Sequence, residues 1–105
     1  MDNIKKRQYR TLDQVEEEYY RNHPEEIDSY LRTAFEEYAQ SGCASTLLSS
    51  LRMIARVKGI SALANKSGLT RNGIQKALSE DAQPRFETIS SIITAMGYSF
   101  TLQKN

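Results

Sequence analysis

Residues 60–79 read ISALANKSGLTRNGIQKALS, two short segments with helical apolar spacing on either side of Gly68. Gly68 can adopt the positive φ of a tight turn without a steric penalty. Thr70 can cap the second segment through its hydroxyl oxygen, and Ser61 can do the same for the first. The pattern predicts a helix-turn-helix, whose second helix enters a groove of DNA.

Polar and apolar side chains separate around the second segment when each residue advances by about 100°. Ile74, Ala77 and Leu78 share the apolar arc. The other arc carries hydrogen-bond donors suited to base edges and phosphates, because Arg pairs with guanine, Asn or Gln with adenine, and Lys with guanine or phosphate. A merely solvated polar face is the alternative. The candidates for reading DNA on this arc are Arg71, Asn72, Gln75 and Lys76.

Length and composition indicate one small globular domain. The 105 residues are 39% hydrophobic and 26% charged, with a net charge of +1. The charge is unevenly divided, since residues 1–41 carry six Lys or Arg against ten Asp or Glu, and residues 42–105 carry eight against three. Such a chain can present one face to a polyanion and another to a basic partner.

Residues for enzyme chemistry are scarce. His23, the one histidine, precedes Pro24 and is expected to cap a helix. Cys43, the one cysteine, follows Gly42 and is expected to be a small packing residue. Metal-ligand spacings, glycine-rich phosphate loops and nucleophile motifs do not occur. The sequence therefore predicts no enzyme, no cofactor and no metal site.

Cysteine content and apolar run lengths bear on localisation. A single cysteine suits a reducing compartment. The opening MDNIKKRQYR lacks the apolar segment of a signal peptide, and no run reaches the roughly 20 apolar residues of a membrane span. We expect a cytoplasmic chain with no membrane partner.

Helical spacing recurs on both sides of the central stretch. Pro24 suits a first helical position, and Gly42 and Gly59 suit helix ends. In the last helix, Phe86 and Met96 are expected to face inward. The predicted helices span residues 12–22, 24–41, 44–58 and 86–96.

The first of these helices has two further features. Leu12, Val15 and Tyr19 fall on one of its sides. Glu17 and Arg21 have the i,i+4 spacing of an ion pair that supports a helix. We therefore expect a short amphipathic helix with an internal ion pair.

The two ends of the chain are predicted to differ from this helical body. Residues 1–11 hold Lys5, Lys6, Arg7 and Arg10, which indicates a flexible basic tail or an arm that follows DNA. Residues 98–102, YSFTL, alternate as a β-strand does. A lone strand leaves its backbone unpaired, so we expect it to pair with a second copy or with a partner's sheet, an unpaired tail being the alternative.

Residues 23–103 resemble the addiction-module antidote proteins, the HigA-like antitoxins with a Cro/repressor-type helix-turn-helix. The departures are Gln75 in place of an aromatic residue, Ala82 with Gln83 in place of Gly-Asn, and Ser67 at an apolar position. The matching pieces are HPEEIDSYL (23–31), LRMIARVKG (51–59), SALANKSGLTRNGIQKALS (61–79), PRFETI (84–89) and AMGYSF (95–100).

The resemblance implies an all-α fold. It would be a five-helix Cro/repressor-like helix-turn-helix domain with an N-terminal helical extension and a short C-terminal β-strand. We expect a single domain over residues 12–105, preceded by the tail. Its parts are acidic helices at 12–42, a DNA-binding unit at 44–97 and the strand at 98–102.

The resemblance also implies the antitoxin of a type II toxin–antitoxin module. Such a protein represses its own operon by binding double-stranded operator DNA as a homodimer, and it neutralises a RelE-like toxin. The acidic segment 16–37 is the expected toxin contact, with a solvated acidic face as the alternative. The DNA-binding candidates are Thr70, Arg71, Asn72, Gln75 and Lys76, with Ser61, Lys66 and Arg85 as phosphate contacts.

Two other functions fit the same sequence. A stand-alone transcriptional regulator without a toxin would share every DNA-binding feature. A protein-interaction module that kept the fold and lost DNA binding would share the helices but not the salt-sensitive affinity for DNA.

Overall fold

A computed structural model describes residues 11–104, and over these residues it contains six α-helices, one 3₁₀ turn and no strand. The all-α prediction is therefore confirmed for this part of the chain. The predicted basic tail lies outside the described residues except for Thr11, which caps the first helix. The elements are α2 (Leu12–Asn22), η1 (Pro24–Glu26), α3 (Ile27–Ser41), α4 (Ala44–Lys58), α5 (Ile60–Ser67), α6 (Arg71–Ala77) and α7 (Phe86–Ala95).

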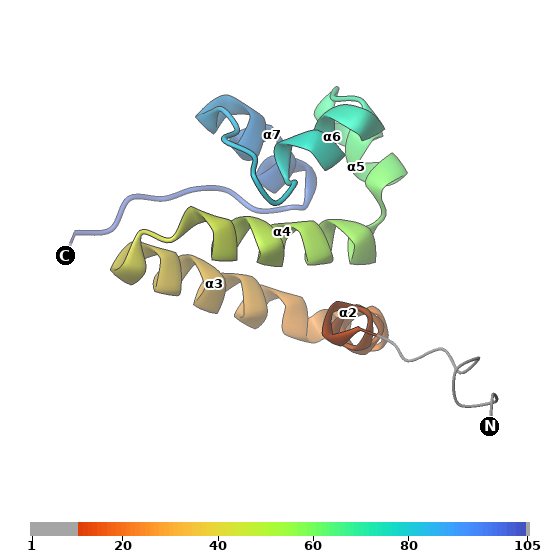
Figure 1. Ribbon diagram of the computed structural model, residues 1–105, viewed down its shortest axis with the longest axis horizontal. Coiled ribbons are helices and arrows are strands. Elements are labelled where there is room, and N and C mark those ends of the chain that lie inside the picture. The colour runs from red at the N-terminus through yellow and green to blue at the C-terminus, as the bar shows by residue number, and fades with distance from the viewer. Residues whose placement is uncertain (1–10, 105) are drawn as a thin grey trace.

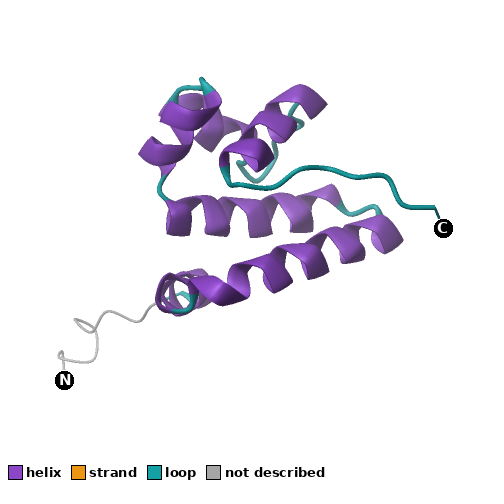
Figure 2. Cartoon of the chain, turned by 180° about the vertical axis from the view of Figure 1, so that it is seen from behind, coloured by secondary structure: helices purple, strands orange, loops and turns teal. Residues whose placement is uncertain are grey.

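Helix α4 lies in the middle of the molecule. Figure 1 shows α2 and α3 along one side of α4, with α5, α6 and α7 on the other side, and the reverse view in Figure 2 agrees. Direct contacts join α4 to α2, α3 and α5, while α5 also packs against α6 and α7. Within residues 11–104, no helix combines the length and the apolar character needed to cross a bilayer.

The burial pattern of α4 explains its central place. Leu51 and Ile54 lie three positions apart, on one side of the helix, and both are fully buried. Met53 points to the opposite side of the helix, yet it is only 2% exposed. A helix on the rim of a bundle would expose that second side. Burial on both sides places α4 between two layers.

The predicted strand at residues 98–102 is absent from the structure, where this segment runs as an elongated loop (Figure 2). The physical reason is that residues 11–104 offer no second strand to pair with it. The side chain of Tyr98 fixes the start of the segment instead. Its hydroxyl donates a hydrogen bond to the Asp28 carboxylate on α3, and its ring lies 5.6 Å from the Lys58 ammonium on α4.

Phe86 does not face inward as predicted. It is the first residue of α7 and 73% exposed, because α7 meets the core only from Ile89 onward. Its ring centroid lies 5.4 Å from that of Phe100, which in turn lies 5.8 Å from that of Phe35 on α3. Met96 is buried as expected.

Candidate nucleic-acid interface

The turn between α5 and α6 is built from residues 68–70. Gly68 ends α5 with φ +79°, and its N–H donates to the Ala64 carbonyl oxygen at 3.1 Å. Only glycine adopts this conformation without strain. The Ser67 hydroxyl accepts a 3.1 Å hydrogen bond from the Leu69 N–H, so serine at this unusual position helps to close the turn.

Thr70 caps α6 as predicted. Its hydroxyl oxygen accepts a 2.9 Å hydrogen bond from the N–H of Gly73. A Cβ at position 73 would lie only 3.0 Å from that oxygen, so glycine fits the cap. Ser61, by contrast, does not cap α5, because the helix already begins at Ile60 and Gly59 occupies the cap position.

The two faces of α6 separate as the sequence predicts. Ile74 is fully buried and Leu78, directly after the helix, is 1% exposed. These two side chains hold α6 on the core. The side chains on the solvent side are all exposed, and they are Arg71, Asn72, Gln75 and Lys76.

The structure brings Arg71 and Ser61 together from neighbouring helices. The Arg71 guanidinium donates a hydrogen bond to the Ser61 hydroxyl. Lys66 is exposed in the last turn of α5. Arg85 stands apart from this group, at the position before α7, and pairs with Glu87 at 3.6 Å.

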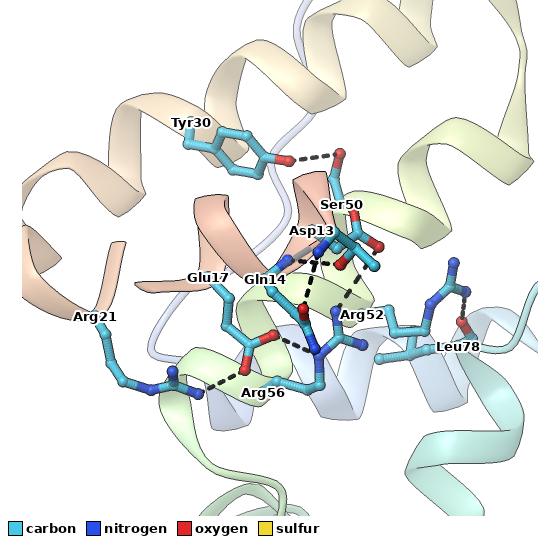
Figure 3. A network of polar contacts seen from close by, with 10 residues as sticks. Asp13, Gln14, Glu17, Arg21, Tyr30, Ser50, Arg52, Arg56 and Leu78 are labelled. Carbon is cyan, nitrogen blue, oxygen red and sulfur yellow. Dashed lines mark hydrogen bonds and ion pairs between the residues drawn. The ribbon is translucent and has the colours of Figure 1, made fainter. Parts of the chain in front are cut away.

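Sequence reasoning missed the contact that anchors the far end of α6. Arg52 on α4 donates a hydrogen bond to the carbonyl oxygen of Leu78, as Figure 3 shows. The partner of Arg52 is a backbone atom 26 residues away, which leaves no signal in side-chain spacing.

A second polar network joins α2 to α4. Glu17 accepts hydrogen bonds from Arg21 at 2.6 Å and from Arg56 at 2.8 Å, and Arg56 also lies 4.0 Å from Asp13 (Figure 3). Burial raises the pKa of Glu17, but the hydrogen bonds and positive charges of Arg56 and Arg21 outweigh it and leave this pKa below its ordinary value. The predicted Glu17–Arg21 pair is thus confirmed, and Arg56 extends it to a second helix.

His23 and Cys43, the two residues considered for chemistry, lie at helix junctions. His23 Nδ1 lies 2.8 Å from the Tyr19 carbonyl oxygen, and its ring stacks on that of Tyr19 at 4.2 Å. His23 therefore caps the end of α2. Cys43 is exposed, so its predicted packing role is wrong. The hydroxyls of Ser45 and Thr46, at 3.4 and 3.2 Å from Sγ, lower the pKa of Cys43 to about 7.

The chain is similar to one protein family and to one curated bacterial protein. Residues 11–104 match the family described as "Probable addiction module antidote protein". An uncharacterised protein of Haemophilus influenzae (strain ATCC 51907 / DSM 11121 / KW20 / Rd) is 35% identical over 81 residues, which cover 77% of this chain and 79% of that protein. No solved structure matches the chain. The match over all of the described residues shows that the chain belongs to this family of addiction module antidote proteins.

Proposed function

We propose that this chain is the antitoxin of a type II toxin–antitoxin module, which represses its own operon and neutralises a RelE-like toxin. Membership in an antidote family supports the antitoxin role, since an antidote implies a toxin. In this proposal the protein is a binding module and not an enzyme. Helices α4 to α7 form a helix-turn-helix unit of the Cro/repressor type.

The exposed side of α6 is the observation that carries the DNA-binding part. Arg71, Asn72, Gln75 and Lys76 lie on one helix, away from its buried residues. With α6 in the major groove, an Arg can pair with guanine, and Asn or Gln with adenine. Thr70 acts mainly as the cap that starts this helix.

Contacts to the DNA backbone would flank the reading helix. Ser61 and Lys66 on α5 are exposed beside α6, and Arg85 is exposed before α7. Contacts of this kind fix the orientation of the protein and supply affinity without reading sequence. The bond from Arg71 to Ser61 also limits the freedom of the Arg71 side chain before DNA arrives.

We also propose that the protein binds its operator as a homodimer through its C-terminal segment. An extended segment with unpaired backbone groups can pair with the same segment of a second copy. Phe86 and Leu102 are 73% and 100% exposed, and Phe100 lies between Phe86 and Phe35. A two-fold dimer would match a palindromic operator, with one α6 in each half-site.

Binding of the full chain to the DNA upstream of its own gene tests the repressor function. Fluorescence anisotropy should give a much lower Kd for this DNA than for random DNA. The logarithm of the affinity should fall with the logarithm of salt concentration, with a slope of about −0.9 for each phosphate contact. Equal affinity for both DNAs, or affinity that does not depend on salt, would exclude a sequence-specific repressor.

The product of the adjacent gene tests the antitoxin function. Co-expressed with this chain, it should co-purify as a stable complex and lose its toxicity. A neighbour that neither binds the chain nor arrests growth would instead support a stand-alone regulator.

A further inference from the structure

Helix α2 leaves its apolar side chains in solvent. No residue of α2 is buried, and Leu12, Val15 and Tyr19 are 74%, 45% and 42% exposed. At about 100° per residue these three positions fall within one narrow arc of the helix. We call this arc, formed by Leu12, Val15 and Tyr19, the α2 stripe. The sequence places these residues on one side, and the structure turns that side outward.

The contacts that hold α2 in place come from its other side. Glu17 binds Arg56 on α4 at 2.8 Å (Figure 3). The ring of Tyr20 lies 4.8 Å from that of Tyr30 on α3. An acidic residue therefore faces the protein while the α2 stripe faces water, the reverse of what the hydrophobic effect favours in an isolated chain. An exposed apolar line on a fixed helix is typical of a binding surface.

Charge around the α2 stripe selects the kind of partner. Residues 11–41 carry nine Asp or Glu against two Lys or Arg. Asp13, Glu25 and Glu26 are exposed at the two ends of α2. A second copy that met the first through this face would bring two acidic surfaces together, and the phosphates of DNA would be repelled as well. The partner that fits the charge around the α2 stripe is therefore a protein with a basic surface.

We propose that the α2 stripe docks into an apolar groove on the toxin, rimmed by Lys and Arg side chains. This proposal rests on the antitoxin function proposed above and assigns the toxin contact to α2. An amphipathic helix recognises a groove through apolar side chains three or four positions apart, which is the spacing of the α2 stripe. Helix α6, the proposed reading helix, lies on the other side of α4 from α2 (Figure 1), so both partners can bind at once.

The test measures the Kd of the full chain for the purified product of the adjacent gene by calorimetry. The double variant Leu12→Ala/Val15→Ala should bind about tenfold or more weakly, as expected when central apolar contacts are truncated. The control, Tyr38→Ala, removes an exposed aromatic side chain on α3, outside both α2 and the proposed dimer segment, and should keep the Kd of the wild type.

Each other outcome overturns a separate part of the proposal. A wild-type Kd for the α2 variant, or equal losses in the α2 variant and the control, would remove α2 from the interface while leaving the antitoxin function intact. A wild type that does not bind the neighbour's product would overturn the antitoxin function, and this inference with it. In the absence of the toxin, the α2 variant should have the same melting temperature as the wild type. A fall of several degrees would show that these side chains support the fold of the chain itself, and would also overturn the proposal.

Discussion

Arg52 on α4 holds the end of α6 by donating a hydrogen bond to the carbonyl oxygen of Leu78. Helix α6 has only seven residues, too few to be stable without tertiary contacts. Thr70 closes its first turn and Arg52 fixes its last, so both ends of the proposed reading helix are anchored.

Replacing Arg52 with Met should therefore loosen α6. We expect a loss of about 1–2 kcal/mol in the free energy of unfolding, because a carbonyl loses its charged donor. Affinity for operator DNA should fall together with stability. Urea unfolding measures the first effect, with Arg32→Met as the control, because Arg32 is exposed on α3. Equal stability of the two variants would show that the bond contributes nothing.

Arg71 and Lys66 should differ in what they contribute to DNA binding. Arg71→Ala should cost roughly 1–3 kcal/mol on operator DNA and relax the base preference at one position. Lys66→Ala should weaken binding to operator and random DNA alike and reduce the salt slope. Competition binding with both DNAs distinguishes the two effects. An equal loss on both DNAs for Arg71→Ala would contradict base reading.

The cap of α6 predicts a coupling between positions 70 and 73. Thr70→Ala should cost about 1 kcal/mol of stability. Gly73→Ala gains up to about 1 kcal/mol of helix propensity, but its Cβ crowds the Thr70 hydroxyl oxygen. The gain should thus be larger when Thr70 is already Ala. A double-mutant cycle by denaturant unfolding measures this coupling, and strict additivity would contradict it.

The ion pairs of Glu17 predict a specific loss of stability in acid. Because the pKa of Glu17 is lowered by folding, its contribution is present above the unfolded value of 4.5 and is lost as pH falls through the folded value. Glu17→Gln should be less stable than the wild type at neutral pH, and the difference should shrink below about pH 4.5. Glu36→Gln, an exposed change on α3, is the control for thermal melts across this range.

The proposed dimer predicts the behaviour of a shortened chain. A chain that ends at Ser99 keeps Tyr98, whose hydroxyl is bonded to Asp28, and loses Phe100 and Leu102. Light scattering should give the mass of a dimer for the full chain and of a monomer for the shortened one. An undiminished dimer would place the interface elsewhere.

Helical periodicity made most of the fold predictable. The boundaries of α2 and α4, the glycine that ends α5 and the cap at Thr70 all follow from local patterns that the structure repeats. The division of α6 into buried and exposed sides follows in the same way, because a period of 3.6 residues fixes both sides at once. Helical periodicity does not predict which partner the exposed side of α6 binds.

Three features depended on contacts that no local pattern contains. The α2 stripe was visible as a pattern in the sequence. Its outward direction, however, is set by the hydrogen bond between Glu17 on α2 and Arg56 on α4. Phe86 fits the apolar period of α7, yet it lies beyond the core. The alternation in residues 98–102 indicates a strand, but a strand also needs a partner, and residues 11–104 supply none.

The central position of α4 has a consequence for protein engineering. The exposed residues of α6 touch neither α2 nor the Glu17–Arg56 network in any described contact, so they can be varied without altering the first layer. Under the proposed function, a library restricted to positions 71, 72, 75 and 76 should therefore yield repressors for new operators that all still accept the same toxin. Changes at the buried positions of α4, such as Leu51 and Met53, offer no such freedom, because these side chains belong to the common support of both layers.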